Sequence, residues 1–202
     1  MKKFLFAELP LALASIVALN VFTDELPIGA DIPNPELKMK DIKGREISLK
    51  EVKQKNGLLV MFSCNTCPVV RGYQSRTKEI CKYALDNNIG VILLNSNEGL
   101  RDDGDSFSDM KQYAQEQEYS WYYAVDEKSK MANAFDANRT PECFLFNKDG
   151  KLSYHGAIDD NPRNSANVKR HHLKEAIDEM NAGKEVTVKI TRSVGCGIKR
   201  EK

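Results

Sequence analysis

The stretch LLVMFSCNTCPVVRGY, residues 58–73, holds two cysteines separated by two residues, at the point where an apolar run gives way to polar residues. Residues 58–63 form a continuous apolar run of strand length, which predicts a central strand buried on both faces. Residues 68–87 follow directly and carry apolar residues at roughly helical spacing. The sequence therefore predicts a strand, a short cysteine-bearing loop and a helix in direct succession.

Three interpretations compete for the cysteine pair, Cys64 and Cys67. A structural zinc site normally needs a second pair of ligands at similar spacing, whereas Cys81, Cys143 and Cys196 are isolated in the chain. A purely structural role in the core is disfavoured, because side chains at a strand-to-helix junction usually reach the surface. The helix dipole and the unpaired N–H groups of a helix N-terminus stabilise a thiolate and lower its pKa. The pattern therefore favours dithiol redox chemistry.

Strands and helices alternate along the rest of the chain. A small hairpin is expected around Lys43-Gly44, and Ser106 is expected to cap a helix. Further strands are predicted at residues 91–95, 121–125 and 142–147, the last continuing through a turn into 151–156. A C-terminal helix at residues 167–183 and an extended tail follow. This order predicts a single α/β domain with a mixed central sheet, spanning residues 24–202.

The N-terminus has its own pattern. Residues 1–23 begin with Met1, Lys2 and Lys3 and turn largely apolar, which is typical of a secretory signal peptide. Glu8 and Pro10 interrupt the apolar run, and an uncleaved membrane anchor or a buried first helix remain open alternatives. We expect an exported protein in a periplasmic or other extracytoplasmic location, in contact with a membrane only through such an anchor. In an oxidising compartment, thiols tend to pair or to serve in redox chemistry.

Composition excludes some classes of partner. The chain has 202 residues, 41% of them hydrophobic and 29% charged, with a formal net charge of +1. A near-neutral chain with scattered charges gives no electrostatic reason to expect a nucleic-acid partner. No motif for a cofactor is evident, and we expect neither a cofactor nor a resident metal.

Two segments together resemble a known family: FSCNTCP after the predicted strand, and RTPECFLFNKDGKLSYHGAIDDN late in the chain. They resemble the thioredoxin-like superfamily, in particular exported redoxin-type proteins related to the AhpC/TSA family. The resemblance implies a thioredoxin-like fold, a solvent-facing nucleophile at Cys64 and a resolving thiol at Cys67. It also implies a cis bond at Pro141, with the backbone of Thr140 ready to pair with a substrate strand.

The chain departs from the family pattern at three places. Ser63 precedes the first cysteine, where thioredoxins carry a Trp, so their redox potential does not transfer. Leu58 stands where thioredoxins carry a buried acid, a role that a water, Glu142 or Glu98 could take over. Met61 stands where a peroxiredoxin would have a Thr, so peroxidase activity is not expected.

The remaining cysteines leave alternatives open. Cys143 follows Pro141 closely and could lie near the dithiol. Cys196 lies between two glycines in VGCGIK, a tail that resembles the GCxIK ending of one branch of redoxin-like proteins. It could be a third redox thiol that attacks a Cys64–Cys67 disulfide, a partner for Cys143, or a structural or free thiol. Cys81 is expected in the core.

The sequence therefore predicts a thiol–disulfide oxidoreductase that exchanges disulfides with protein or small-molecule substrates and with an unidentified electron donor or acceptor. One alternative is a copper-binding or delivery module of the same fold, using Cys64, Cys67 and His155. Another is a non-catalytic binding domain that keeps the fold and a purely structural disulfide.

Overall fold

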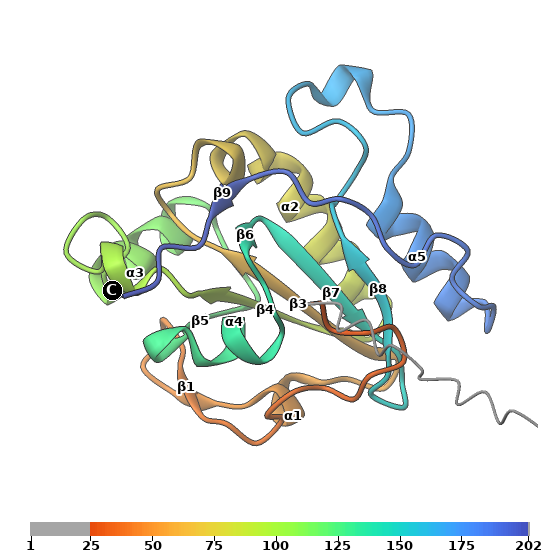
Figure 1. The fold of residues 1–202 in the computed structure, drawn as a ribbon, viewed down its shortest axis with the longest axis horizontal. Helices are drawn as coiled ribbons and strands as arrows, with labels where there is room; N and C mark the ends of the chain where they lie inside the picture. The colour runs from red at the N-terminus through yellow and green to blue at the C-terminus, as the bar shows by residue number, and fades with distance from the viewer. Residues whose placement is uncertain (1–24, 202) are drawn as a thin grey trace, which may run out of the picture.

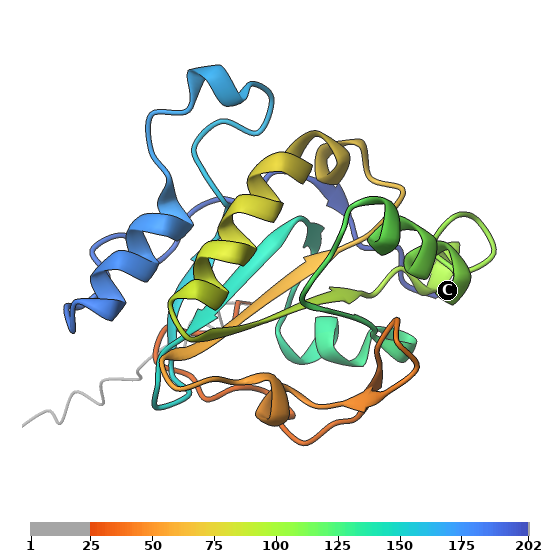
Figure 2. The ribbon, with the colours of Figure 1, turned by 180° about the vertical axis from the view of Figure 1, so that it is seen from behind.

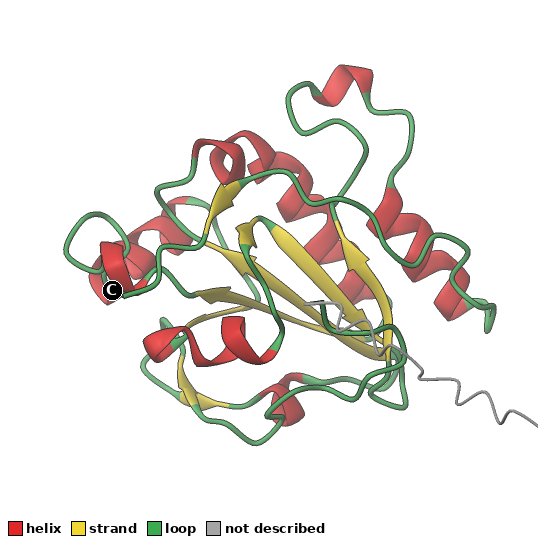
Figure 3. Ribbon diagram, viewed as in Figure 1, coloured by secondary structure: helices red, strands yellow, loops and turns green. Residues whose placement is uncertain are grey.

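The computed structural model describes residues 25–201, so the predicted signal peptide or anchor at residues 1–23 lies outside the described residues. A five-stranded mixed sheet forms the centre of the fold (Figures 1 and 3). β3 runs parallel to β4, and β4 runs parallel to β5, whereas β7 is antiparallel to both β3 and β8. This arrangement confirms the predicted α/β class. The strands are, in sheet order, β5 (Tyr122–Val125), β4 (Ile89–Asn95), β3 (Gly57–Ser63), β7 (Glu142–Phe146) and β8 (Leu152–Gly156).

Helices cover both faces of this sheet (Figures 1 and 2). One face packs against α2 (Pro68–Asp86), α3 (Phe107–Glu116) and α5 (His172–Asn181). The opposite face packs against α1 (Leu49–Val52) and α4 (Lys130–Ala134). Such a three-layer arrangement is what strands alternating with helices are expected to form.

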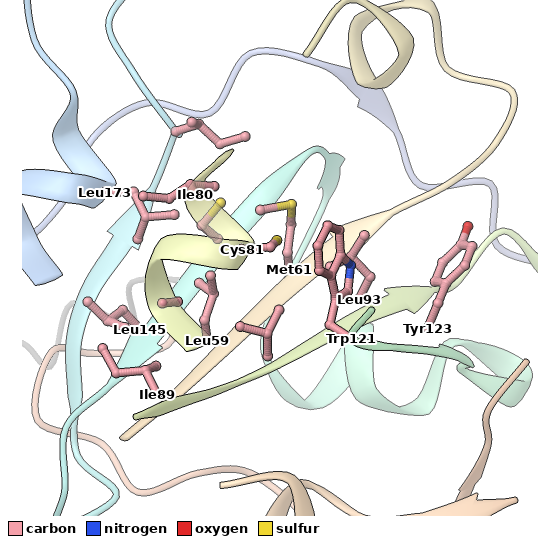
Figure 4. Close-up of a cluster of buried hydrophobic side chains, with 14 of the residues drawn as sticks. Leu59, Met61, Ile80, Cys81, Ile89, Leu93, Trp121, Tyr123, Leu145 and Leu173 are labelled. Atoms are coloured by element: carbon pink, nitrogen blue, oxygen red, sulfur yellow. The ribbon is translucent and has the colours of Figure 1, made fainter. Parts of the chain in front are cut away.

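The central strand β3 explains why residues 58–63 are continuously apolar. All seven of its residues are buried, and successive side chains point to opposite faces. Leu59 and Met61 join the layer beneath α2, whereas Val60 and Phe62 join the layer above α4. Figure 4 shows the first layer, in which Cys81 of α2 lies among the apolar side chains of the sheet. The predicted two-sided burial is confirmed.

Local signals correctly marked several other elements. The predicted hairpin consists of β1 (Met39–Lys40) and β2 (Glu46–Ile47). The turn between them contains Gly44, whose φ of 77° suits glycine. Ser106 caps α3, because its hydroxyl accepts a hydrogen bond from the Asp109 N–H while the Asp109 side chain accepts one from Ser106.

The C-terminal part departs from expectation in two places. The last helix begins at His172 rather than near residue 167, because the chain just before it is held to Asp160. The Asp160 carboxylate accepts the Lys169 N–H, and the Asp160 N–H bonds the Arg170 carbonyl. The extended tail carries a short strand, β9 (Cys196–Gly197), which pairs with β6 (Arg139–Thr140). No helix between residues 25 and 201 is long and apolar enough to cross a membrane.

Candidate active site

Sheet topology brings the two sequence motifs together. β3 and β7 are antiparallel, and Phe62 at the end of β3 is the register partner of Glu142 at the start of β7. The loop that follows β3 and the segment that precedes β7 must therefore lie at the same edge of the sheet. That edge holds the CNTC loop and the Thr140-Pro141 bond, which is cis as the resemblance implied.

The cysteines pair in a way that the sequence did not single out. Cys67 forms a disulfide with Cys196, with 6.0 Å between their Cα atoms, and Cys64 is a free thiol. Of the alternatives for Cys196, pairing with Cys143 is wrong, since Cys143 is a free, fully buried cysteine. The expected Cys64–Cys67 disulfide is absent from this state of the protein.

Thr140 contacts the sulfur atoms of both CNTC cysteines. The Cys64 thiol and the Thr140 hydroxyl form a hydrogen bond of 3.3 Å. The Cys67 sulfur lies 3.4 Å from the Thr140 carbonyl oxygen. A reduced thiol and a disulfide sulfur are thus held against one residue next to the cis peptide bond.

Cys64 is not the exposed, acidic thiol that was expected. It is only 1% exposed, and burial raises its pKa above the ordinary value for cysteine. The hydrogen bond from Thr140 works in the opposite direction and lowers this pKa, whereas the negative charge of Asp105 raises it. Weaker hydrogen bonds from the Cys67 backbone N–H, at the N-cap of α2, and from the Thr66 hydroxyl also lower this pKa. Cys196 packs against the pair.

Asp105 is the buried acid of the site, and sequence reasoning missed it. It is fully buried and accepts hydrogen bonds from the Asn65 backbone N–H (2.7 Å) and the Thr66 hydroxyl (2.8 Å), both in the CNTC loop. The side-chain amides of Asn95 and Asn97 supply two more, at 2.8 and 2.9 Å. Four donors satisfy one carboxylate, which fixes the loop between the two cysteines. Only its place in the polar loop after β4 hinted at this role.

The two acids proposed from sequence serve elsewhere. Glu98 forms an ion pair with Arg101 at 2.7 Å. Glu142 accepts the N–H groups of Asn138 and Arg139, at 2.8 and 3.0 Å, and bonds His155 at 2.8 Å. Glu142 therefore shapes the approach to the cis peptide bond rather than contacting a cysteine.

Polar side chains from neighbouring elements hold the CNTC loop and the segment around Asp105 in place. The Tyr123 hydroxyl donates to the Asn65 side chain at 2.9 Å, and Arg71 donates to the Asn65 carbonyl at 2.8 Å. Arg101 donates to the carbonyls of Asn95 and Asp105, at 2.7 and 2.8 Å. These contacts come from α2, β5 and the loop after β4, so the cysteine loop is fixed on several sides.

The remaining candidates lie away from this centre. Cys143 and Cys81 are core residues whose pKa values burial raises, and the prediction for Cys81 is confirmed. His155 bonds Glu142 and stacks on Phe144, with ring centroids 4.2 Å apart. Within residues 25–201, no group of three or more His, Cys, Asp or Glu side chains is arranged to hold a metal ion. The copper alternative therefore lacks a donor set in the described structure.

Comparison with known proteins identifies the family of the chain. The model of the AhpC/TSA family matches residues 28–155, and the chain belongs to that family. A structure of an uncharacterized conserved protein from Geobacillus kaustophilus is 30% identical, with a TM-score of 0.80, covering 87% of this chain and 93% of that one. A hypothetical protein from Sinorhizobium meliloti is 27% identical, with a TM-score of 0.80, covering 88% and 96%.

More distant structures share the fold. The thioredoxin domain of a thiol-disulfide oxidoreductase from Bacteroides vulgatus is 18% identical, with a TM-score of 0.54, covering 65% of this chain and 89% of that one. The comparison with curated proteins returns no match. The chain is thus an AhpC/TSA-family protein with a thioredoxin-like fold, as the sequence motifs indicated.

Proposed function

We propose that the protein is a thiol–disulfide oxidoreductase that exchanges disulfides with protein or small-molecule substrates through Cys64 and Cys67. The observation that carries the proposal is a free thiol and a disulfide sulfur held against Thr140, next to a cis-proline bond. A family whose members share a thioredoxin-like fold supports it. Cys81 and Cys143 belong to the main core layer, whereas Cys64, Cys67 and Cys196 lie together at this edge of the sheet.

The exchange runs in two steps once the Cys67–Cys196 disulfide has been opened. The Cys64 thiolate attacks one sulfur of a substrate disulfide, which forms a mixed disulfide and releases the other substrate sulfur as a thiolate. The Cys67 thiolate then attacks the Cys64 sulfur, which forms Cys64–Cys67 and releases the second substrate thiol. In reverse, the oxidised pair would take electrons from a substrate dithiol.

Partners and location belong to the same proposal. A dithiol donor or a disulfide acceptor restores the starting state, and the protein works outside the cytoplasm. The location rests on the basic start and apolar run of residues 1–23, which are typical of an export signal. Fractionation of cells that express the full chain would test it.

Reduction of insulin disulfides by the reduced full chain tests the chemistry. We expect Cys64→Ser to abolish the reaction, because in the proposed mechanism Cys64 is the thiol that forms the mixed disulfide with the substrate. Cys67→Ser should accumulate a covalent complex with insulin on Cys64, since its resolving thiol is gone. Cys81→Ala, which removes a core thiol, serves as the matched control and should retain the wild-type rate.

Two outcomes would overturn the proposal. If Cys64→Ser reduces insulin as fast as the wild type, Cys64 is not the nucleophile. If no form of the protein reacts and the disulfide resists mild dithiols, the domain is a non-catalytic binding module with a structural disulfide.

A further inference from the structure

The C-terminal tail crosses the edge of the sheet that carries the cysteines. It leaves the end of α5 and runs back over the fold, so that β9 lies beside β6 (Figure 1). The pairing is antiparallel, with Thr140 opposite Cys196 and Arg139 opposite Gly197. The tail therefore occupies the backbone position beside the cis-proline bond that a substrate strand was expected to use.

Contacts beyond Cys196 hold the tail in this place. The Ile198 N–H donates to the Asn138 carbonyl at 3.0 Å, and the Ile198 side chain is buried. The Lys199 N–H donates to the Asn97 side chain at 2.9 Å, and the Lys199 carbonyl accepts the Gly99 N–H at 2.8 Å. Asn97 also bonds Asp105, so the tail and the CNTC loop share one network of hydrogen bonds. Cys196 is thus a fixed part of the site.

A close backbone approach depends on one of the two glycines that flank Cys196. A Cβ atom on Gly195 would lie 2.0 Å from the Thr140 carbonyl oxygen, a distance that no real contact allows. A Cβ atom on Gly197 would meet only the Asn138 carbonyl oxygen, at 3.9 Å, which is ordinary contact. Neither glycine has a left-handed φ. The two positions therefore differ in the room available for a Cβ atom and not in backbone strain.

We propose that Cys196 is a third redox thiol, which takes the disulfide over from the Cys64–Cys67 pair and thereby returns Cys64 to its thiol form. This inference rests on the proposed function, because it needs a Cys64–Cys67 disulfide as its starting point. The Cys67–Cys196 disulfide of the structure is the product of the transfer, with Cys64 already free.

The transfer is balanced within the molecule. The Cys196 thiolate attacks the Cys67 sulfur, a Cys67–Cys196 bond forms, and the Cys64–Cys67 bond breaks. Cys64 leaves as a thiolate and takes up a proton, since burial raises its pKa. One disulfide is present before and after, so the step consumes no external electrons.

The three cysteines of the site differ in their exposure to solvent. Cys64 is 1% exposed and Cys67 is 3% exposed, whereas Cys196 is only partly buried. The transfer therefore moves the disulfide from two buried cysteines onto a pair that includes the partly buried Cys196. A dithiol donor then reduces it: one donor thiolate attacks Cys196 and releases Cys67, and the second donor thiol displaces Cys196 and becomes oxidised.

Oxidation of the reduced full chain with one equivalent of diamide tests the transfer without any donor. Samples are quenched with acid at increasing times and alkylated after denaturation, and the disulfide-linked peptides are identified by mass. In the wild type we expect Cys64–Cys67 to appear first and to convert to Cys67–Cys196, with Cys64 alkylated. Cys196→Ser should stay at Cys64–Cys67 and show at least about tenfold less free Cys64, since the thiol that displaces Cys64 from the disulfide is gone.

The flanking glycines supply a test that keeps all cysteines. Gly195→Ala should displace the tail from Thr140 and slow the appearance of Cys67–Cys196 by about tenfold or more, because the Cys196 thiol is then present near Cys67 at a lower effective concentration. Gly197→Ala is the matched control and should convert at the wild-type rate. Both variants keep the Cys64–Cys67 pair, so both should still reduce insulin in a single turnover.

The outcomes separate this inference from the proposed function. If the wild type stops at Cys64–Cys67 with Cys196 alkylated, or if Gly195→Ala converts as fast as Gly197→Ala, the third-thiol role is refuted. Single-turnover reduction of insulin by Cys196→Ser would leave the proposed function standing in that case. If no variant reduces insulin at all, the proposed function is refuted, and the third-thiol role that rests on it is refuted as well.

Discussion

At the scale of single residues, Thr140 and Asp105 set the chemistry of Cys64 in opposite directions. Burial raises the pKa of Cys64 most, and the Asp105 carboxylate adds to this, whereas the hydrogen bond that the Thr140 hydroxyl can donate to the thiolate lowers it. Asp105 accepts two hydrogen bonds from the CNTC loop and two from the side chains of Asn95 and Asn97, so it ties the loop to the end of β4. Fixing the loop therefore makes Cys64 a less acidic thiol.

Replacing Thr140 with valine tests the first of these effects. Thr140→Val keeps the shape of the side chain and the carbonyl near Cys67, but it removes the hydrogen bond to Cys64. The pKa of Cys64 should rise further, so alkylation of Cys64 in the reduced protein at pH 7 should slow by about threefold to tenfold, the range expected for a hydrogen bond of about 1 kcal/mol. The rate is read as a function of pH by peptide mass.

The exposed Thr187 offers a control for this measurement. Thr187→Val should leave the pH profile of Cys64 alkylation unchanged. An unchanged profile in Thr140→Val as well would mean that the hydroxyl does not stabilise the Cys64 thiolate.

At the scale of elements, two glycines illustrate how position decides whether a side chain is tolerated. Gly72 lies on the exposed side of α2, and a Cβ atom there would meet nothing within 4 Å. Gly90 lies in β4 against the α1 segment, where a Cβ atom would lie 1.9 Å from the Val52 carbonyl oxygen. A side chain would fit at position 72 of the helix, whereas position 90 of the strand has room only for glycine.

Alanine at the two positions should therefore have opposite effects on the free energy of unfolding. Gly72→Ala should stabilise the protein by about 0.5–1 kcal/mol, because alanine favours helix and restricts the unfolded chain. Gly90→Ala should destabilise it by about 1–3 kcal/mol or more, because the backbone of α1 has to move. Urea unfolding of the full chain measures both, and destabilisation by Gly72→Ala would contradict the assignment of its open surroundings.

At the scale of the whole molecule, the core layers bury several groups that titrate at alkaline pH. Burial raises the pKa values of Tyr73, Tyr119, Tyr123, Tyr154, Cys81 and Cys143. The unfolded chain loses these protons near the ordinary values, about 8.5 for cysteine and about 10 for tyrosine, while the native protein keeps them. The native state therefore binds more protons in this range.

Stability should accordingly fall as pH rises. We expect the free energy of unfolding to decrease above about pH 8.5 and more steeply above about pH 10, at up to about 1.4 kcal/mol per pH unit for each buried group. Urea unfolding of the reduced protein between pH 7 and 11 measures the slope without disulfide exchange. Cys81→Ala should flatten the first part of this decline, and an unaltered slope there would show that Cys81 does not contribute.

Much of the fold follows from local sequence patterns. The apolar run at residues 58–63 predicted β3, and the helical spacing after Pro68 predicted α2. These elements are decided by neighbours in the chain, through side-chain periodicity, whereas the cis Thr140-Pro141 bond was expected from the family resemblance alone. The short strands β6 and β9 left no such pattern, because a two-residue pairing depends on its partner.

The site was predictable only in part, for the same reason. Residue type and spacing are enough to predict that two thiols follow a buried strand and that a Thr-Pro segment opens a later one. The pairing of Cys67 with Cys196 across 129 residues of chain, the burial of Cys64 and the position of Asp105 beside it emerge only when the chain is folded. The disulfide pairing, the burial of Cys64 and its pKa depend on atoms that come into contact through the antiparallel register of β3 and β7 and the path of the tail. The spacing of residues along the chain does not determine those distances.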